Sequence, residues 1–105
     1  MSLFIVAFRL HYDTEARYNR CYEELTAAIL AESGPKHWAE ATSLYLVTSN
    51  KNSTNLAEAI WANTPSFDDG EDLLVVINIS VSKGHAVKGT LRDRDFAALM
   101  AGRTS

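Results

Sequence analysis

Apolar positions concentrate in two short runs that the rest of the chain has to cover. Residues 3–10 and 73–81 are rich in β-branched and aromatic side chains and are too short for buried helices, so each predicts a central β-strand. Both strands carry apolar side chains on both faces, and both faces therefore need covering. In the second strand one face is wholly apolar. The other face begins with Leu74 and Val76 but turns polar at Asn78, and we expect this face to meet a partner.

Between these strands the apolar positions recur every three or four residues, which predicts two helices. The first helix is capped by Asp13 or Thr14 and ends at about residue 32, where Ser-Gly-Pro breaks it. Its apolar stripe consists of Tyr18, Cys21, Tyr22, Leu25, Ala28 and Ile29. The second helix begins at Thr54 and ends before Pro65.

The remaining segments predict shorter elements. Residues 36–41 and 43–49 indicate a hairpin, although no glycine defines its turn. Residues 83–90 are bounded by glycines and indicate a short added strand. Asp93 is expected to cap a last helix that runs through Ala101.

The order strand, helix, strand, strand, helix, strand is typical of an α+β fold, the ferredoxin-like βαββαβ sandwich, here with a C-terminal extension. We expect one domain over residues 1–105, in which residues 82–105 form the extension and contribute to dimer contacts. Both helices would cover one face of the sheet and leave the other bare, so we expect a homodimer. The expected interface residues are Leu74, Val76, Phe96 and Leu99.

Composition narrows the functional classes. The net charge of −3 disfavours a general nucleic-acid coat, although nucleic acid stays possible as a partner through a basic patch near the C-terminus. Cys21 is the only cysteine, which excludes an internal disulfide and a thiolate zinc cluster. No stretch has the length of a membrane span and no cleavable leader is present, so we expect a cytoplasmic protein without a membrane partner.

Few residues suggest catalytic chemistry. His11 and Asp13 follow the first strand and are the candidates for a general-base or hard-cation site, but helix capping explains Asp13 more simply. His37 and His85 have no second ligand at metal spacing. The acidic residues between 68 and 72 fit a solvated turn, so we expect neither a metal nor a cofactor.

Two further features fit structural roles better than binding roles. The glycine spacing of residues 84–90 is that of a phosphate-binding loop, but the lysine after the second glycine is absent. Trp38 and Trp61 have side chains that stack on bases in other proteins, yet we expect them at an interface.

A family resemblance rests on residues 4–10 (FIVAFRL), on Tyr18 and Leu25, and on residues 42–48 (TSLYLVT). Together they resemble the SinR-like relatives of the CRISPR-associated adaptation nucleases, over most of residues 3–81. The resemblance implies a ferredoxin-like homodimer in which C-terminal segments extend a neighbour's sheet.

The same resemblance bears on chemistry. In the family, an aspartate after an aromatic residue near the end of the first strand is thought to hold a divalent cation for phosphodiester cleavage. The aligned pair here is Phe8 and Arg9, and a guanidinium cannot serve as the oxygen ligand of a cation. Arg9 is instead an expected contact for an anion or phosphate.

Three functions follow from these observations. We favour a non-catalytic, dimeric ferredoxin-like protein that acts in interactions or in association with nucleic acid. The alternatives are a divergent endonuclease for RNA or DNA that depends on Mg²⁺ or Mn²⁺, and a small-molecule-binding module. Because Arg9 occupies the place of the family's aspartate, we expect no cation-dependent cleavage.

Overall fold

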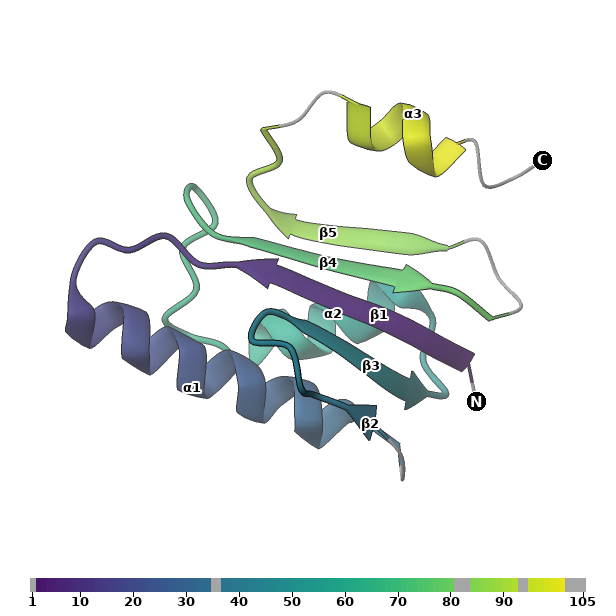
Figure 1. Cartoon of the computed structure of the whole chain (residues 1–105), viewed down its shortest axis with the longest axis horizontal. Coiled ribbons are helices and arrows are strands. Elements are labelled where there is room, and N and C mark those ends of the chain that lie inside the picture. Colours follow the sequence, from purple (N-terminus) through teal and green to yellow (C-terminus); the bar gives the residue numbers. More distant parts are fainter. Residues whose placement is uncertain (1, 35–36, 81–83, 93–94, 102–105) are drawn as a thin grey trace.

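The computed structural model describes residues 2–34, 37–80, 84–92 and 95–101, and these form an α+β fold with a five-stranded antiparallel sheet and three helices (Figure 1). The elements are β1 (Ser2–Arg9), α1 (Glu15–Glu32), β2 (His37–Trp38), β3 (Leu44–Ser49), α2 (Ser53–Ala62), β4 (Leu73–Asn78), β5 (His85–Gly89) and α3 (Asp95–Ala101). The strand order in the sheet is β2-β3-β1-β4-β5. The first apolar run of the sequence is therefore the central strand, as predicted.

One face of the sheet is covered by α1 and α2, and α3 lies beyond β5 (Figure 1). In the register of the sheet, Val6 of β1 lies opposite Tyr45 of β3 and Val76 of β4. These side chains join apolar residues of the two helices in a single core. The core consists of Phe4, Val6, Phe8, Leu25, Ala28, Ile29, Tyr45, Val47, Leu56, Ala57, Ile60, Leu74 and Val76.

The two long helices confirm the periodicity of the sequence, and each begins at a side-chain cap. The Oγ1 atom of Thr14 accepts a hydrogen bond from the backbone N–H of Arg17 at 3.2 Å. Asn52 caps α2 in the same way, since its Oδ1 atom accepts from the N–H of Asn55 at 2.7 Å. Each cap satisfies a donor that the first helical turn leaves without a partner.

Several boundaries differ from the predictions. The first hairpin strand is reduced to β2, because residues 39–43 are mostly exposed and form no strand, and residue 36 lies outside the described residues. The β4 strand ends at Asn78, whose Oδ1 atom accepts a hydrogen bond from Ser80 N at 2.9 Å and so turns the chain. The predicted cap Asp93 also lies outside the described residues.

The two faces of β4 require a correction. Leu74 lies opposite Phe8 and Val76 lies opposite Val6, and all of these side chains are buried beneath the helices. Leu74 and Val76 are therefore core residues and are not available to a partner. The sequence pattern could not decide this, because both faces of β4 are apolar at this point and only the register with β1 selects the covered one.

Candidate functional site

The face of the sheet opposite α1 and α2 is apolar across all five strands, and we call it the open face. It consists of Leu3, Ile5, Ala7, Arg9, Trp38, Leu44, Leu46, Thr48, Leu73, Val75, Ile77, His85 and Val87, which the strand register places on one side. One cross-strand row runs from Trp38 through Leu46 and Ile5 to Ile77. Directly opposed side chains in such rows touch one another, so the apolar surface is continuous.

The exposure of this face is unusual for a sheet. An antiparallel sheet that faces water on one side normally alternates apolar and polar residues, so that the wet face is polar. Here Leu3 is 37% exposed and Trp38 is 39% exposed, while Ile5 and Ile77 are half-buried and Val75 is buried. The open face thus has the composition of a buried surface without a second layer of the described chain over most of it.

The short helix α3 forms a rim at the β5 edge of the open face (Figure 1). The ring of Phe96 contacts His85 edge-on, with ring centroids 5.5 Å apart and an interplanar angle of 71°. Leu99 on the same helix is 67% exposed. Of the expected interface residues, Phe96 therefore lies next to the open face and Leu99 is exposed on the same helix, whereas Leu74 and Val76 lie on the other side of the sheet.

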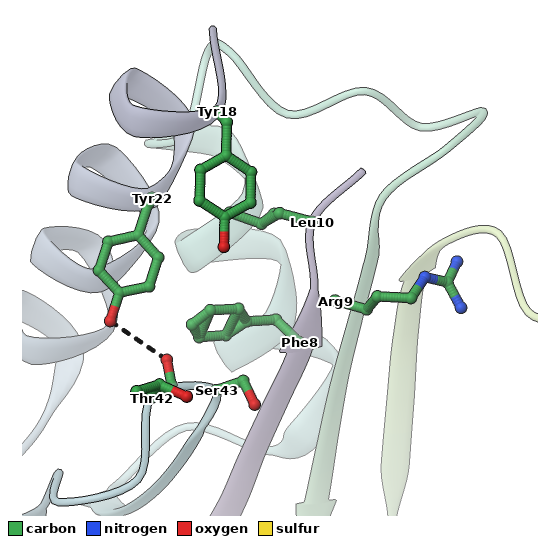
Figure 2. A pocket seen from close by; sticks show the side chains of 7 residues that line it. All are labelled: Phe8, Arg9, Leu10, Tyr18, Tyr22, Thr42 and Ser43. Carbon is green, nitrogen blue, oxygen red and sulfur yellow. Dashed lines mark hydrogen bonds between the residues drawn. The ribbon is translucent and has the colours of Figure 1, made fainter. Parts of the chain in front are cut away.

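Arg9 lies at one end of the open face. One guanidinium nitrogen, Nη2, lies 3.1 Å from the carbonyl oxygen of Thr90 and 3.3 Å from that of Glu71, and it donates to both. Figure 2 shows the side chain leaving β1 on the side away from Tyr18 and Tyr22. The residue expected to contact an anion thus joins the ends of β1, β4 and β5, with part of its donor capacity already used inside the chain.

The catalytic candidates His11 and Asp13 have structural partners. Asp13 accepts hydrogen bonds from Thr14 N at 2.6 Å and from Arg17 Nε at 3.1 Å, and these two contacts lower the pKa of its carboxyl. The Nδ1 atom of His11 lies 3.7 Å from a carboxylate oxygen of Glu71. Within the described ranges, no group of three His, Cys, Asp or Glu side chains is placed to hold a metal ion.

A buried ion pair between Arg17 and Asp72 was not predicted. Asp72 is fully buried and accepts from Arg17 Nη1 at 2.7 Å, from His11 N at 2.7 Å and from Asp68 N at 2.9 Å. Burial by itself would raise the pKa of Asp72, but the Arg17 guanidinium and the backbone donors outweigh it and the pKa is lowered. This carboxylate therefore links the start of α1 to the segment that precedes that helix and to the loop that precedes β4.

Cys21 borders the same ion pair, with Sγ 3.9 Å from an oxygen of Asp72. Burial, and next the charge of Asp72, raise the pKa of the Cys21 thiol to about 11. The thiol is therefore protonated near neutral pH and is a poor nucleophile. Its complete burial agrees with its place in the apolar stripe predicted for the first helix.

The remaining candidates also have partners within the chain. Trp61 donates to Asp69 at 2.8 Å and lies beneath the ammonium of Lys88, which is 4.8 Å from the ring centroid. Trp61 is packed against the core, so of the two tryptophans only Trp38 lies on the open face. Residues 85–89 form a strand, as predicted for the glycine-bounded segment 83–90.

No protein-family model, curated protein or solved structure matches this chain. The resemblance to the SinR-like proteins therefore stays a prediction. Within the part of the chain that the structure describes, no helix has the length and apolarity needed to cross a membrane.

Proposed function

We propose that this protein is a non-catalytic interaction module that functions as a homodimer, with the open face as the interface. The observation that supports the proposal is the continuous apolar surface across the five strands, where Leu3, Ile5 and Ile77 are only partly covered. Removing apolar surface from water contributes roughly 25 cal/mol per Å². A sheet with this composition gains stability when a second layer covers it.

A second copy of the chain is the occupant that the charge distribution favours. The open face has one permanent charge, that of Arg9, and this charge lies at the end of the face instead of its centre. A twofold axis through the centre would bring apolar surface onto apolar surface and send the two Arg9 side chains to opposite ends. No oppositely charged partner is needed to match such a face. The exposed Leu99 on α3 would extend the contact at its rim.

We further propose that β1, α1, β2, β3, α2 and β4 form a ferredoxin-like βαββαβ unit to which β5 is added. The proposal is supported by the central position of β1 between β3 and β4 and by the placement of both long helices on one face. In the described chain β5 pairs with its own β4, so an extension of the neighbour's sheet by this strand is not required for the dimer.

With respect to the family resemblance, the proposal describes a member without nuclease activity. Arg9 stands where the nucleases present a carboxylate, and Asp13 already binds Thr14 and Arg17. We expect no cleavage of short RNA or DNA with Mg²⁺ or Mn²⁺. Cleavage that copurifies with the protein and disappears in an Asp13→Ala variant would contradict this part of the proposal.

The dimer is tested by a matched pair of charge substitutions. Leu3 on the open face is 37% exposed and Leu30 on α1 is 42% exposed, so Leu3→Glu and Leu30→Glu disturb the folded monomer to a similar extent. Sedimentation velocity at micromolar concentration should give a dimer for the wild type and for Leu30→Glu, but mostly monomer for Leu3→Glu. A monomeric wild type, or equal masses for the two variants, would refute the open face as the interface.

A further inference from the structure

A second surface feature lies on the helix side of the sheet, away from the open face. It is an open pocket of about 260 Å³ between the end of β1, the first turns of α1 and the segment that leads into β3 (Figure 2). Its lining consists of Phe8, Arg9, Leu10, Tyr18, Tyr22, Thr42 and Ser43. This volume lies just below the range of about 300 to 1,000 Å³ that is typical of drug-sized ligands, so the pocket suits a smaller molecule.

The wall of the pocket is aromatic. The rings of Tyr18 and Tyr22 are stacked with centroids 6.4 Å apart and an interplanar angle of 16°, and Phe8 meets Tyr22 edge-on at 6.0 Å. Figure 2 shows both tyrosines projecting from α1 toward Phe8. An arrangement of this kind offers flat apolar area of low conformational entropy, which favours a planar ring as the ligand.

Hydroxyl groups provide the polar contacts. The Tyr22 hydroxyl already has a partner within the chain, because it donates to the carbonyl oxygen of Thr42 at 3.2 Å. The Tyr18 hydroxyl and the side-chain hydroxyls of Thr42 and Ser43 have no hydrogen-bond partner among the described residues. A hydroxyl both donates and accepts, so these three groups match the mixed donors and acceptors at the edge of a heterocycle.

Charge limits the class of ligand further. The one charged residue in the lining is Arg9, and its guanidinium points away from the pocket and donates to Glu71 and Thr90 (Figure 2). A phosphate or carboxylate on the ligand would therefore find no cation in the lining to replace its hydration. The ligand that fits is uncharged.

From the aromatic wall, the three hydroxyls and the lack of an inward-facing charge, we propose that this pocket binds an uncharged nucleobase ring, either free or as a nucleoside. The ring packs against the side chains of Tyr18 and Phe8, and its polar edge bonds to the Tyr18 and Ser43 hydroxyls. The same ring also occurs as an unstacked base in single-stranded RNA, where the phosphates would add a strong dependence on salt. The lining of the pocket has no inward-facing cation for those phosphates.

The experiment is a calorimetric or NMR titration with the four RNA bases, their nucleosides and their monophosphates. At least one base or nucleoside should bind, its monophosphate should bind no more tightly, and added KCl should leave the affinity unchanged. Binding of an RNA hexamer with strong salt dependence, without binding of any base or nucleoside, would overturn the proposal. A lack of binding by every base and nucleoside at millimolar concentration would overturn it as well.

Two matched variants locate the site. Tyr18→Phe keeps the aromatic wall and removes one hydroxyl, and should weaken binding about fivefold, as expected for one lost hydrogen bond. Tyr12→Phe makes the same chemical change at a residue that is 62% exposed and outside the lining, and should leave binding unchanged. Equal effects of the two variants would refute this pocket as the site.

Because the pocket and the open face lie on opposite sides of the sheet, the titration is repeated on Leu3→Glu, where binding should persist even if the dimer is lost.

Discussion

At the scale of single residues, the buried carboxylate of Asp72 links segments that are far apart in the sequence, and no sequence motif indicates these links. Its oxygens receive donors from Arg17 on α1, from His11 before that helix and from Asp68 in the preceding loop. Its backbone carbonyl also accepts from Thr90 N at 2.9 Å, which anchors the end of β5. A buried charge is tolerated in a folded protein only when it is paired and hydrogen-bonded in this way.

Removal of the cationic partner should therefore be costly. We expect Arg17→Met to lower the free energy of unfolding by about 3 kcal/mol, because it leaves the Asp72 carboxylate buried without its ion-pair partner. The matched control is Arg20→Met, since Arg20 lies on the same helix but is exposed and has no ion pair among the described residues. Urea unfolding at neutral pH measures both variants, and equal losses of stability would show that the pair is not structural.

The lowered pKa of Asp72 predicts a dependence of stability on acid. A carboxyl with a lower pKa in the folded state contributes stability that is complete above its unfolded pKa of about 3.9 and is lost as the pH falls through the folded pKa. Asp72→Asn should be less stable than the wild type at pH 7, and the difference should shrink as the pH drops below about 4. Urea titrations across this range measure the difference, and a constant offset would contradict the prediction.

The sequence could not have identified this residue among its neighbours. Asp68, Asp69, Glu71 and Asp72 form one acidic run, and nothing in the pattern separates the fully buried member from the others. One partial signal existed, because Asp72 is the member of the run that comes directly before the apolar strand β4. Its partner Arg17 is 55 residues away, so the pairing depends on the tertiary fold.

At the scale of elements, β5 is held against β4 by a backbone contact that tolerates only glycine. Gly89 has a φ of 91°, and a Cβ atom built there would lie 1.8 Å from the carbonyl oxygen of Asp72. A side chain at this position would collide with backbone atoms that cannot move without breaking the end of the sheet. The added strand thus depends on one residue at its last position.

We expect Gly89→Ala to lower the free energy of unfolding by about 2 kcal/mol or more. Gly70→Ala is the matched control, because a Cβ at Gly70 would lie 3.4 Å from Asp68 Oδ1, which is close to an ordinary van der Waals contact. Gly70→Ala should change the stability little. Thermal or urea unfolding distinguishes the two variants, and similar stabilities would show that β5 adapts to the larger residue.

Most of the elements could be predicted because their apolar periods are regular. The positions of α1 and α2 followed from the spacing of apolar residues, and the start of α1 followed also from the predicted cap at Asp13 or Thr14, all of which are local features. The shortening of β2 could not be predicted, because it depends on which parts of residues 36–41 the rest of the chain covers in the folded structure. For the same reason the sequence assigned Leu74 and Val76 to the face of β4 that meets a partner, whereas the structure buries both under the helices, although the sequence correctly indicated that one face of the sheet lacks helices.

At the scale of the whole molecule, the described residues form one sheet with α1 and α2 on one face, and so they have one core and, on the other face, an apolar surface that is largely uncovered. The dimer that we propose would turn this surface into a second core. Unfolding of the protein would then be linked to dissociation, because a partner that binds only the folded chain stabilises it by mass action.

The midpoint of thermal unfolding should consequently rise with protein concentration for the wild type and for Leu30→Glu. It should stay constant for Leu3→Glu, which we expect to unfold as a monomer. Calorimetric scans over a hundredfold range of concentration measure this difference. A wild-type midpoint that is independent of concentration would indicate that folding does not depend on a partner.

The central position of β1 has a consequence for how the protein is made. This strand is synthesised before both of its neighbours, β3 and β4, and β4 is complete only at residue 78. A nascent chain that has reached residue 72 has an apolar first strand with one edge unpaired, and partly built sheets of this kind are prone to aggregation. We expect the domain to fold only after most of the chain has been synthesised, with residues 3–8 depending on chaperones until then.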